Sequence, residues 1–474
     1  MGHVQRITFH APEPQTAKVM PEPSTTPASE LIHQQVQGVR SALDHLLPGC
    51  NISVEVLERN AFLQRHTPEA FHERSGQVLD EQEALLWVKL PGDCFGLFTV
   101  ARARIPFSEA EHDLLATFTE TIRDVQFVTS EWEIQQAELV SNSHAFERLL
   151  TAHLLRGENP ESVGFWTPNL IIGQLQDLAI RRYEGQPTTS GFIVVSHPEA
   201  YLERQVAPSP YTFAPFPEHI PLHENFFEKA ASHRYIDGRN AFYLIDRRLD
   251  VRGVLRDTEP TRYDKVGRAA NEHLEPLLQA DASEVWAGYV GNNDDVNVAV
   301  TRRKHLRWLT SHWHFVDQHH LTNALHQQGL ASGEIDELVA IMLAVSDLRR
   351  GTLILIPDDE EHLPERAGHI DDSPLGESLY ESLVGRKMSG LRRERSAIGM
   401  LTSDGMTTIA RSGRIMGCGK IVRVERMSEH QQRAGGGRTQ AAIAASRYGL
   451  VIKISEDGLI SFFKDGREQI RIVF

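Results

Sequence analysis

Cysteine is scarce in this sequence, and the few cysteines are far apart. They are Cys50, Cys94 and Cys418, an odd number without any C-x-x-C pair. Such a set supplies neither a disulfide framework nor a cysteine-based zinc site. We therefore expect a protein of a reducing compartment, the cytoplasm.

Long apolar runs are also missing. Hydrophobic residues make up 41% of the chain, but no run approaches the about 20 apolar residues that cross a bilayer as a helix. The N-terminus carries no apolar core of the kind that a signal peptide needs. The sequence therefore predicts no membrane partner.

Basic residues are outnumbered by acidic ones. Lys and Arg total 49 against 64 Asp and Glu, which gives a formal net charge of -15 at pH 7. A protein that wraps nucleic acid needs a large basic surface to displace counterions from the phosphates. The charge balance argues against nucleic acid as a partner and leaves room for a small anionic ligand at a local basic cluster.

Histidine is abundant, with 23 in the chain. The sequence HWH occupies residues 312–314, and HH occupies residues 319–320. Neither spacing matches the H-E-x-x-H pattern of a helical zinc site, and the neighbours Trp313 and Phe315 are apolar. We expect these histidines to have a structural or incidental role.

The 474 residues exceed one ordinary hydrophobic core, which predicts two or three domains. Residues 1–28 are rich in Pro, Ser and Thr and predict a flexible leader. Residues 29–130 mix helical and strand patterns, and residues 131–290 predict a further α/β region for regulation or assembly. Residues 291–474 alternate strands and helices, which predicts an α/β domain around a mixed sheet.

The region 29–130 closes with PFSEAEHDLLATF. Ser108 followed by Glu111 predicts a capping box, and the spacing of Leu114 and Phe118 predicts an amphipathic helix. The order of helix, strands and closing helix resembles a GAF-type sensor domain, which implies a sensory role. A mixed α/β domain without that role is the alternative.

Three loops of the last region carry residue types that suit a nucleotide. Asp404-Gly405 interrupts an apolar segment, where a carboxylate can hold a divalent cation or a ribose hydroxyl and a glycine admits a ligand to the backbone. GGGRTQ at 435–440 leads into a small-residue helix, whose first amides and dipole favour a phosphate. SEDG at 455–458 offers a hydroxyl and carboxylates after a strand. Each motif alone is also typical of an ordinary turn.

The order and spacing of these segments resemble the diadenylate cyclase domain, which also forms the N-terminus of the DNA-integrity-scanning protein. ELVAIMLAVSDLRRGTLILIPDD is similar to the entry helix and first core strand of that domain. SDGMTTIARSGRIMGCG is similar to its Asp-Gly-Ala motif, and GGGRTQAAIAAS to its Gly-Thr-Arg-His-Arg motif. LVIKISEDGLISFFKDG looks like its last strand pair. The resemblance covers about the last third of the chain.

The resemblance implies a role for each matching position. Asp404 binds Mg²⁺ or Mn²⁺ and helps to prepare the 3′-hydroxyl of a nucleotide for attack. Arg438 and the glycine loop hold the phosphates. In the family two domains face each other, each with one ATP, and each 3′-hydroxyl attacks the opposite α-phosphate with release of pyrophosphate. The implied site is catalytic Asp404, Gly405 and Arg438; nucleotide-binding Met406, Gly435, Gly436, Gly437, Arg438, Thr439, Gln440 and Ser455; and metal-binding Asp404 and Glu456.

Two departures from the family pattern bear on activity. The alanine of Asp-Gly-Ala is Met406, and Arg-His-Arg is Arg438-Thr439-Gln440, so two groups able to carry charge are neutral here. Loss of one cationic contact to a transferring phosphate costs about a hundredfold in rate. Arginines nearby are candidates to replace it: Arg392, Arg393, Arg395 and Arg433. A run of charges is more often a solvated face.

The expected function is a nucleotide second-messenger synthase under the control of an N-terminal sensor. It would condense two nucleoside triphosphates, ATP by resemblance or another NTP or dNTP, into a cyclic or linear dinucleotide. The alternative is a nucleotide-binding sensor without turnover that regulates an effector protein. We expect a homo-oligomer with facing cyclase-like domains, and stress or antiviral signalling is a hypothesis for its role.

Overall fold

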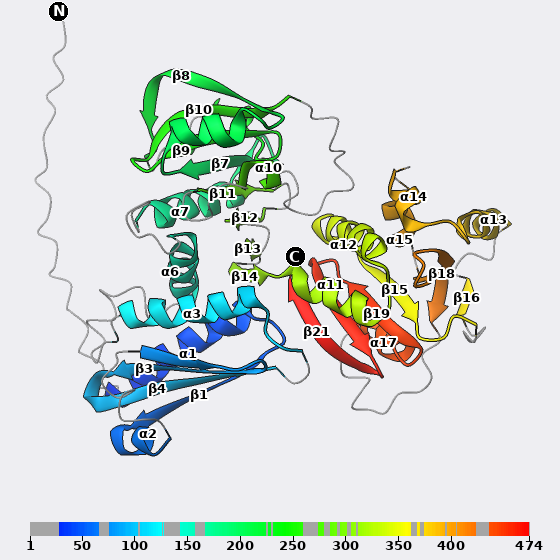
Figure 1. Ribbon diagram of the computed structural model, residues 1–474, viewed down its shortest axis with the longest axis horizontal. Coiled ribbons are helices and arrows are strands. Elements are labelled where there is room, and N and C mark those ends of the chain that lie inside the picture. The colour runs from blue at the N-terminus through cyan, green and yellow to red at the C-terminus, as the bar shows by residue number, and fades with distance from the viewer. Residues whose placement is uncertain are drawn as a thin grey trace, which may run out of the picture.

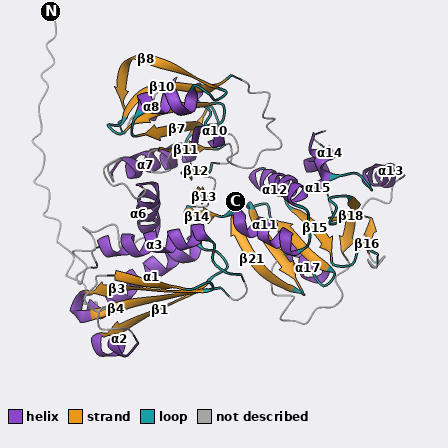
Figure 2. Ribbon diagram, in the orientation of Figure 1, coloured by secondary structure: helices purple, strands orange, loops and turns teal. Residues whose placement is uncertain are grey.

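The computed structural model shows a mixed α/β protein, as the sequence predicts (Figure 1). Its described residues form three large sheets and one two-stranded sheet. Helices lie against these sheets (Figure 2). None of the described helices is long and apolar enough to cross a membrane. The described residues are 28–65, 75–102, 105–125, 127, 143–156, 166–223, 226–228, 231–258, 274–278, 285–291, 294–300, 305–309, 311–361, 367–369, 374–393, 396–403, 405–422 and 436–473. The leader expected over 1–28 therefore lies outside them, apart from its last residue.

The first unit is a four-stranded antiparallel sheet between helices. Its elements are α1 (Ala28–Leu46), β1 (Asn51–Glu58), α2 (Arg59–Arg65), β2 (Ser75–Leu79), β3 (Glu83–Leu90), η2 (Pro91–Asp93), β4 (Cys94–Ala101) and α3 (Glu109–Asp124). The strand order is β1-β4-β3-β2. Phe98 of β4 packs with α1 and α3 on one face, while Phe95 stacks on Phe62 of α2 on the other. The predicted capping box opens α3, and the assignment to the GAF type stays a prediction.

The second unit is built on an eight-stranded sheet of order β14-β13-β12-β11-β7-β9-β10-β8, in which only β7 and β9 pair parallel. Its elements are α6 (Ser143–Arg156), α7 (Trp166–Ile180), β5 (Arg182–Tyr183), β6 (Gln186–Pro187), β7 (Ser190–Val195), α8 (Pro198–Tyr201), η3 (Leu202–Val206), β8 (Tyr211–Pro221), η4 (Phe226–Glu228), α9 (Ala231–Arg234), β9 (Ala241–Asp246), β10 (Asp250–Asp257), α10 (Glu275–Leu278), β11 (Val285–Val290), β12 (Val296–Ala299), β13 (His305–Leu309) and β14 (His312–Val316). The boundary expected between residues 290 and 291 falls inside this sheet, because β12 pairs antiparallel with β11. The sheet extends the second unit to β14.

The C-terminal third is a seven-stranded mixed sheet of order β16-β18-β17-β15-β19-β20-β21, covered by helices. Its elements are α11 (Gln318–Gln327), α12 (Ser332–Asp347), β15 (Thr352–Pro357), β16 (Ala367–His369), α13 (Pro374–Leu383), α14 (Met388–Arg393), α15 (Ala397–Leu401), β17 (Met406–Ile409), β18 (Ile415–Val422), α17 (Gly437–Ala445), β19 (Gly449–Ile454), β20 (Leu459–Lys464) and β21 (Arg467–Val473). Every residue of β15 is buried. Leu353 and Leu355 face α17, whereas Ile354 and Ile356 face α12, because side chains alternate along a strand.

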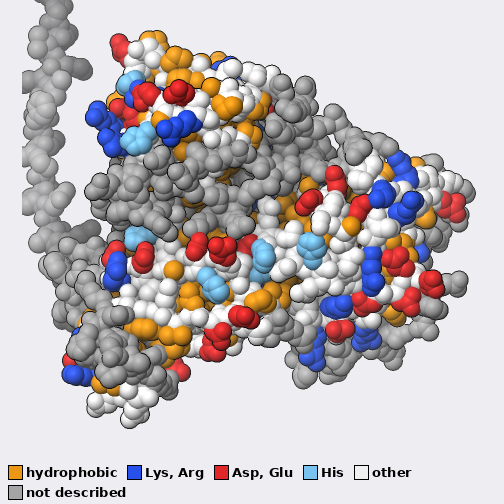
Figure 3. All heavy atoms as spheres, in the orientation of Figure 1, with side chains coloured by type: hydrophobic (Ala, Val, Ile, Leu, Met, Phe, Trp, Pro, Cys, Tyr) orange, Lys and Arg blue, Asp and Glu red, His pale blue; other side chains and the backbone are white. Residues whose placement is uncertain are grey.

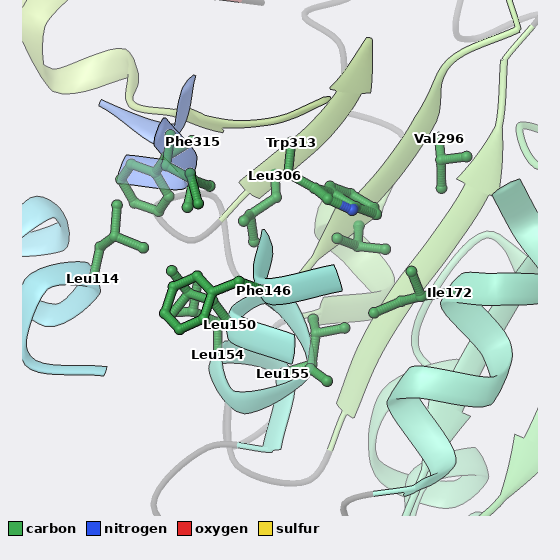
Figure 4. Close-up of a cluster of buried hydrophobic side chains, with 14 of the residues drawn as sticks. Leu114, Phe146, Leu150, Leu154, Leu155, Ile172, Val296, Leu306, Trp313 and Phe315 are labelled. Atoms are coloured by element: carbon green, nitrogen blue, oxygen red, sulfur yellow. The ribbon is translucent and has the colours of Figure 1, made fainter. Parts of the chain in front are cut away.

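An apolar core joins the first two units. Phe146 and Leu150 of α6 point toward Trp313 and Phe315 of β14, and Leu114 of α3 lies at the same cluster (Figure 4). All five side chains are almost completely buried. The first unit is therefore packed against the sheet of the second through α6, and a single core spans both.

A buried polar network ties the first unit to the start of the C-terminal third. Arg102 donates to both carboxylate oxygens of Glu111, at 2.8 and 2.6 Å, and Nε2 of His320 on α11 lies 2.7 Å from Oε2 of Glu111. Ser108 donates to Asp317, which caps α11 by accepting from the amide of His319. His320 therefore has a structural role through its side chain, whereas His319 contributes its backbone amide to the cap of α11.

The stability of this network should depend on pH. Burial alone would raise the pKa of Glu111. Hydrogen bonds and charges from His320 and Arg102 outweigh this effect, so the pKa falls from its ordinary value of 4.5 to about 2. The stabilisation is therefore present above pH 4.5 and is lost as the pH falls toward 2. We expect Glu111→Gln to lower the free energy of unfolding at pH 7 by about 3 kcal/mol, because Arg102 keeps a buried charge without its carboxylate. Urea denaturation at pH 7 and at steps down to pH 3 measures both effects.

The matched control is Glu120→Gln, an exposed position on the same helix. It should change stability by less than about 0.5 kcal/mol. A Glu111→Gln protein as stable and as acid-sensitive as the wild type would contradict the assignment of the network.

Candidate functional site

A cavity of about 290 Å³ lies at one end of the C-terminal sheet, where several elements begin or end. It brings together the Asp-Gly loop and the glycine-rich loop, which are about thirty residues apart in the sequence. Small-molecule sites commonly have volumes of about 300 to 1,000 Å³, so this cavity is at the lower limit. Its described lining residues are Gly351, Thr352, Leu353, Ser403, Gly405, Met406, Lys420, Ile421, Val422, Gly437, Arg438 and Ala441.

The parallel pairing of β15 and β17 places the Asp-Gly loop at the cavity. Leu353 pairs with Met406, so both strands start at the same edge of the sheet. Gly405 has a φ of 97°, a conformation that favours glycine. A Cβ atom at this position would lie 2.6 Å from the carbonyl carbon of Gly419 on β18. A glycine is thus required at position 405 because the backbones of Gly405 and β18 approach closely. The same glycine also lines the cavity, where a ligand can contact it.

The glycine-rich loop delivers the N-terminal end of α17 to the same cavity. Gly436 is the N-cap and makes no side-chain capping bond, while Gly437 and Arg438 line the cavity. The amides of Thr439 and Gln440 already donate to the carbonyl of Gly436. The first amides of α17 and its dipole therefore favour an anion at this point.

Arg438 lies at the cavity wall because position 351 is a glycine. A Cβ atom at Gly351, directly before β15, would overlap the guanidinium group of Arg438. Nη1 of Arg438 donates to Oε1 of Glu456 at 2.6 Å, and both side chains are well exposed to solvent. An incoming anion would compete with Glu456 for Arg438.

Lys420 is a second cation of the cavity, and the sequence did not predict it. A bulge separates the pairs Met406–Lys420 and Thr408–Gly417, and Gly419 in the bulge has a φ of 66°. Bulges turn side chains out of the regular alternation and recur beside binding sites. The two glycines at 417 and 419 were the available signal, because they break the strand pattern directly before the lysine.

The other predicted residues lie at various distances from the cavity. Met406 lines it and is also buried in the core between β15 and α17. Thr439 accepts a hydrogen bond of 3.1 Å from Lys453, and burial lowers the pKa of that lysine. Ser455 donates to the carbonyl of Leu459 and closes the β19–β20 turn instead of lining the cavity. Gln440 is on α17 and half-buried.

Several predictions fall outside the described residues. Asp404 is one of them, although its neighbours Ser403 and Gly405 both line the cavity. Gly435 is another. The backbone or side chains of the arginines that are candidates to replace the altered motif are also outside the described residues: Arg392, Arg393, Arg395 and Arg433.

The charge of the cavity suits an anion. Lys420 and Arg438 are its charged side chains, and no acidic residue is among the described lining residues. On the face of the C-terminal third that Figure 3 shows, Lys and Arg are interspersed with Asp and Glu. Since Glu456 is paired with Arg438, the described lining does not assemble the oxygen ligands that Mg²⁺ takes.

No protein-family model matches the chain, and no curated protein matches it in sequence. A function for the cavity therefore has to be argued from its residues.

The backbone requirement at Gly405 can be tested by stability. We expect Gly405→Ala to lower the free energy of unfolding by about 1 to 3 kcal/mol, because alanine is strained at this φ and its Cβ meets the backbone of β18. Gly399→Ala is the control, since Gly399 is exposed in α15 and open space surrounds its position. It should leave stability unchanged or raise it slightly. Equal unfolding transitions for the two variants would overturn this account of Gly405.

Proposed function

We propose that the C-terminal third is a nucleotidyltransferase of the diadenylate cyclase type, which binds a nucleoside triphosphate in the cavity between β15, β17, β18 and α17. The observation that carries the proposal is the meeting of Gly405 with Gly437 and Arg438 in one cavity. The resemblance predicted these loops as one nucleotide site from the sequence alone. The substrate would be the triphosphate with its divalent cation, Mg²⁺ or Mn²⁺.

The residues of the cavity have distinct tasks in this proposal. The first amides of α17 bind phosphate oxygens, and Lys420 and Arg438 offset the negative charge that develops as pyrophosphate leaves. Gly405 lets the sugar lie against the backbone. Lys420 takes the place of a cation that the altered Arg-Thr-Gln sequence lacks, since it approaches the cavity from β18.

The reaction would join two nucleotides held by facing copies of the chain. The 3′-hydroxyl of one nucleotide attacks the α-phosphorus of the other, and the bond to the β-phosphate oxygen breaks. Asp404 would ready the hydroxyl. Two such attacks close a ring, and a single attack yields a linear product.

The second candidate is a nucleotide sensor without turnover that controls a partner protein. A specific observation favours it: Arg438 is held by Glu456, and Thr439 is engaged by Lys453. The two positions after Arg438 then supply no free cation for the transition state. Binding would survive, because amide groups at a helix N-terminus suffice to hold phosphate.

Product formation separates the two candidates. Purified protein is incubated with each of the four NTPs and four dNTPs with Mg²⁺ or Mn²⁺, and products are identified by mass spectrometry. We expect a dinucleotide and pyrophosphate from the wild type and no product from Asp404→Asn. Lys420→Ala should lower kcat/KM by about a hundredfold, because a cation opposite the phosphates is lost.

Lys89→Ala is the control, because Lys89 is a solvent-exposed lysine of the first unit. It should keep wild-type activity. Binding without product from any of the eight nucleotides would favour the sensor, and activity retained in Asp404→Asn would contradict the synthase.

Two substitutions beside Arg438 should change nucleotide affinity in opposite directions. Glu456→Gln should tighten nucleotide binding by about two- to fivefold, because it removes an exposed ion pair that competes with phosphate. Gly351→Ala should weaken binding, since the added methyl group displaces the guanidinium of Arg438. Calorimetric titration measures both.

Gly333→Ala serves as the control for the added methyl group, because open space surrounds that position in α12. Weaker metal-dependent binding in Glu456→Gln would instead support the metal role that the family resemblance implies for Glu456.

A further inference from the structure

A cluster of histidines surrounds a buried carboxylate where the first unit meets the second, far along the chain from the nucleotide cavity. Glu147 of α6 is completely buried. Nδ1 of His45, at the end of α1, lies 2.8 Å from its Oε1, and Nδ1 of His312, at the start of β14, lies 3.0 Å from the same oxygen. The three ligand atoms come from three elements and converge on one point.

Among the described residues, the ion-pair partners of Glu147 are His45 and His312, and no Lys or Arg joins them. A fully buried carboxylate that has no Lys or Arg partner among the described residues is costly unless a cation binds to it.

We propose that Glu147, His45 and His312 form a binding site for a divalent transition metal of the zinc class. Two imidazole nitrogens and one carboxylate oxygen are a ligand set that Zn²⁺ takes, with a water completing the tetrahedron. Neighbouring ligand atoms in such a shell are about 3.3 Å apart. The observed distances of 2.8 and 3.0 Å from Oε1 of Glu147 to the two imidazole nitrogens would therefore have to lengthen by only a few tenths of an ångström.

The surroundings hold the ligands in place and leave them accessible. The amide of Trp313 donates to Oε2 of Glu147 at 2.8 Å, which orients the carboxylate and leaves Oε1 for the ion. His45 and His312 remain 30% and 26% exposed, so an ion can enter from solvent. His314 donates from Nδ1 to the carbonyl of His45 and fixes the end of α1. Hydrogen bonds of this kind orient ligands in established metal sites.

The consequence of binding is a metal-dependent link between the two units. The ligands belong to α1 of the first unit, and to α6 and β14 of the second. An ion held by all three would stabilise their packing, and its removal would loosen it. The site involves none of the residues of the nucleotide cavity, so it does not depend on the proposed nucleotidyltransferase activity.

Zinc titration of the full chain tests the site. Protein stripped of metal with a chelator is titrated with Zn²⁺ by calorimetry, and bound zinc is counted by elemental analysis. We expect His45→Gln and His312→Gln to bind one zinc fewer per chain than the wild type, with the affinity of that site reduced more than about a hundredfold. His33→Gln is the matched control, because His33 is exposed on the same helix as His45.

Cobalt provides a second measurement that needs no variant. Co²⁺ bound to the wild type should show the strong visible absorption of a four-coordinate ion, and added Zn²⁺ should abolish it. Zinc binding should also raise the Tm of the wild type and of His33→Gln, but not that of His312→Gln. Equal zinc content in all four proteins, or no visible Co²⁺ absorption in the wild type, would overturn the proposal.

Discussion

The parallel pairing of β15 and β17 is the constraint on which the candidate site depends. Antiparallel neighbours would put the starts of these strands at opposite edges of the sheet, whereas Leu353 and Met406 are paired at one edge. The same edge receives the end of β18 with Lys420 and the N-terminal end of α17. Four segments thus meet at one cavity, which is lined by two cations, Gly405 and the first turn of α17.

The packing of α17 against the sheet places its first turn at the cavity wall. Ala442 and Ala445 of α17 are buried against Leu353 and Met406 of the sheet. Small side chains bring the helix close to the strands, so its first turn is carried to the cavity wall. Met406 therefore serves the core and the cavity together, which gives a physical reason for a longer side chain at this position.

The sequence predicted local elements well, but it predicted contacts between distant residues poorly. The alternation of apolar residues predicted the buried strand β15, and Ser108 with Glu111 predicted the cap of α3, because both patterns are local. Contacts between residues that are far apart in the sequence leave no pattern in either segment. The pairing of Glu456 with Arg438 joins the β19–β20 turn to the start of α17, which only the fold brings together. The bulge that presents Lys420 did have a local signal, in Gly417 and Gly419.

The histidines illustrate the same limit. Spacing along the chain correctly gave His320 a structural role, which it fulfils with Glu111. It gave no indication that His312 lies beside His45 and Glu147, because 165 residues separate His312 from the carboxylate. The extent of the second unit was misjudged for a related reason, since strands β12 to β14 were assigned by their sequence neighbours and not by their pairing with β11.

The most direct measurement of the central claim is a crystal structure of the protein with a non-hydrolysable ATP analogue and Mn²⁺. The account predicts the triphosphate at the first turn of α17, within contact of Lys420 and Arg438, with the sugar against Gly405 and the anomalous signal of manganese beside Asp404. An ordered nucleotide bound elsewhere on the chain, or a cavity without nucleotide at saturating concentration, would contradict it.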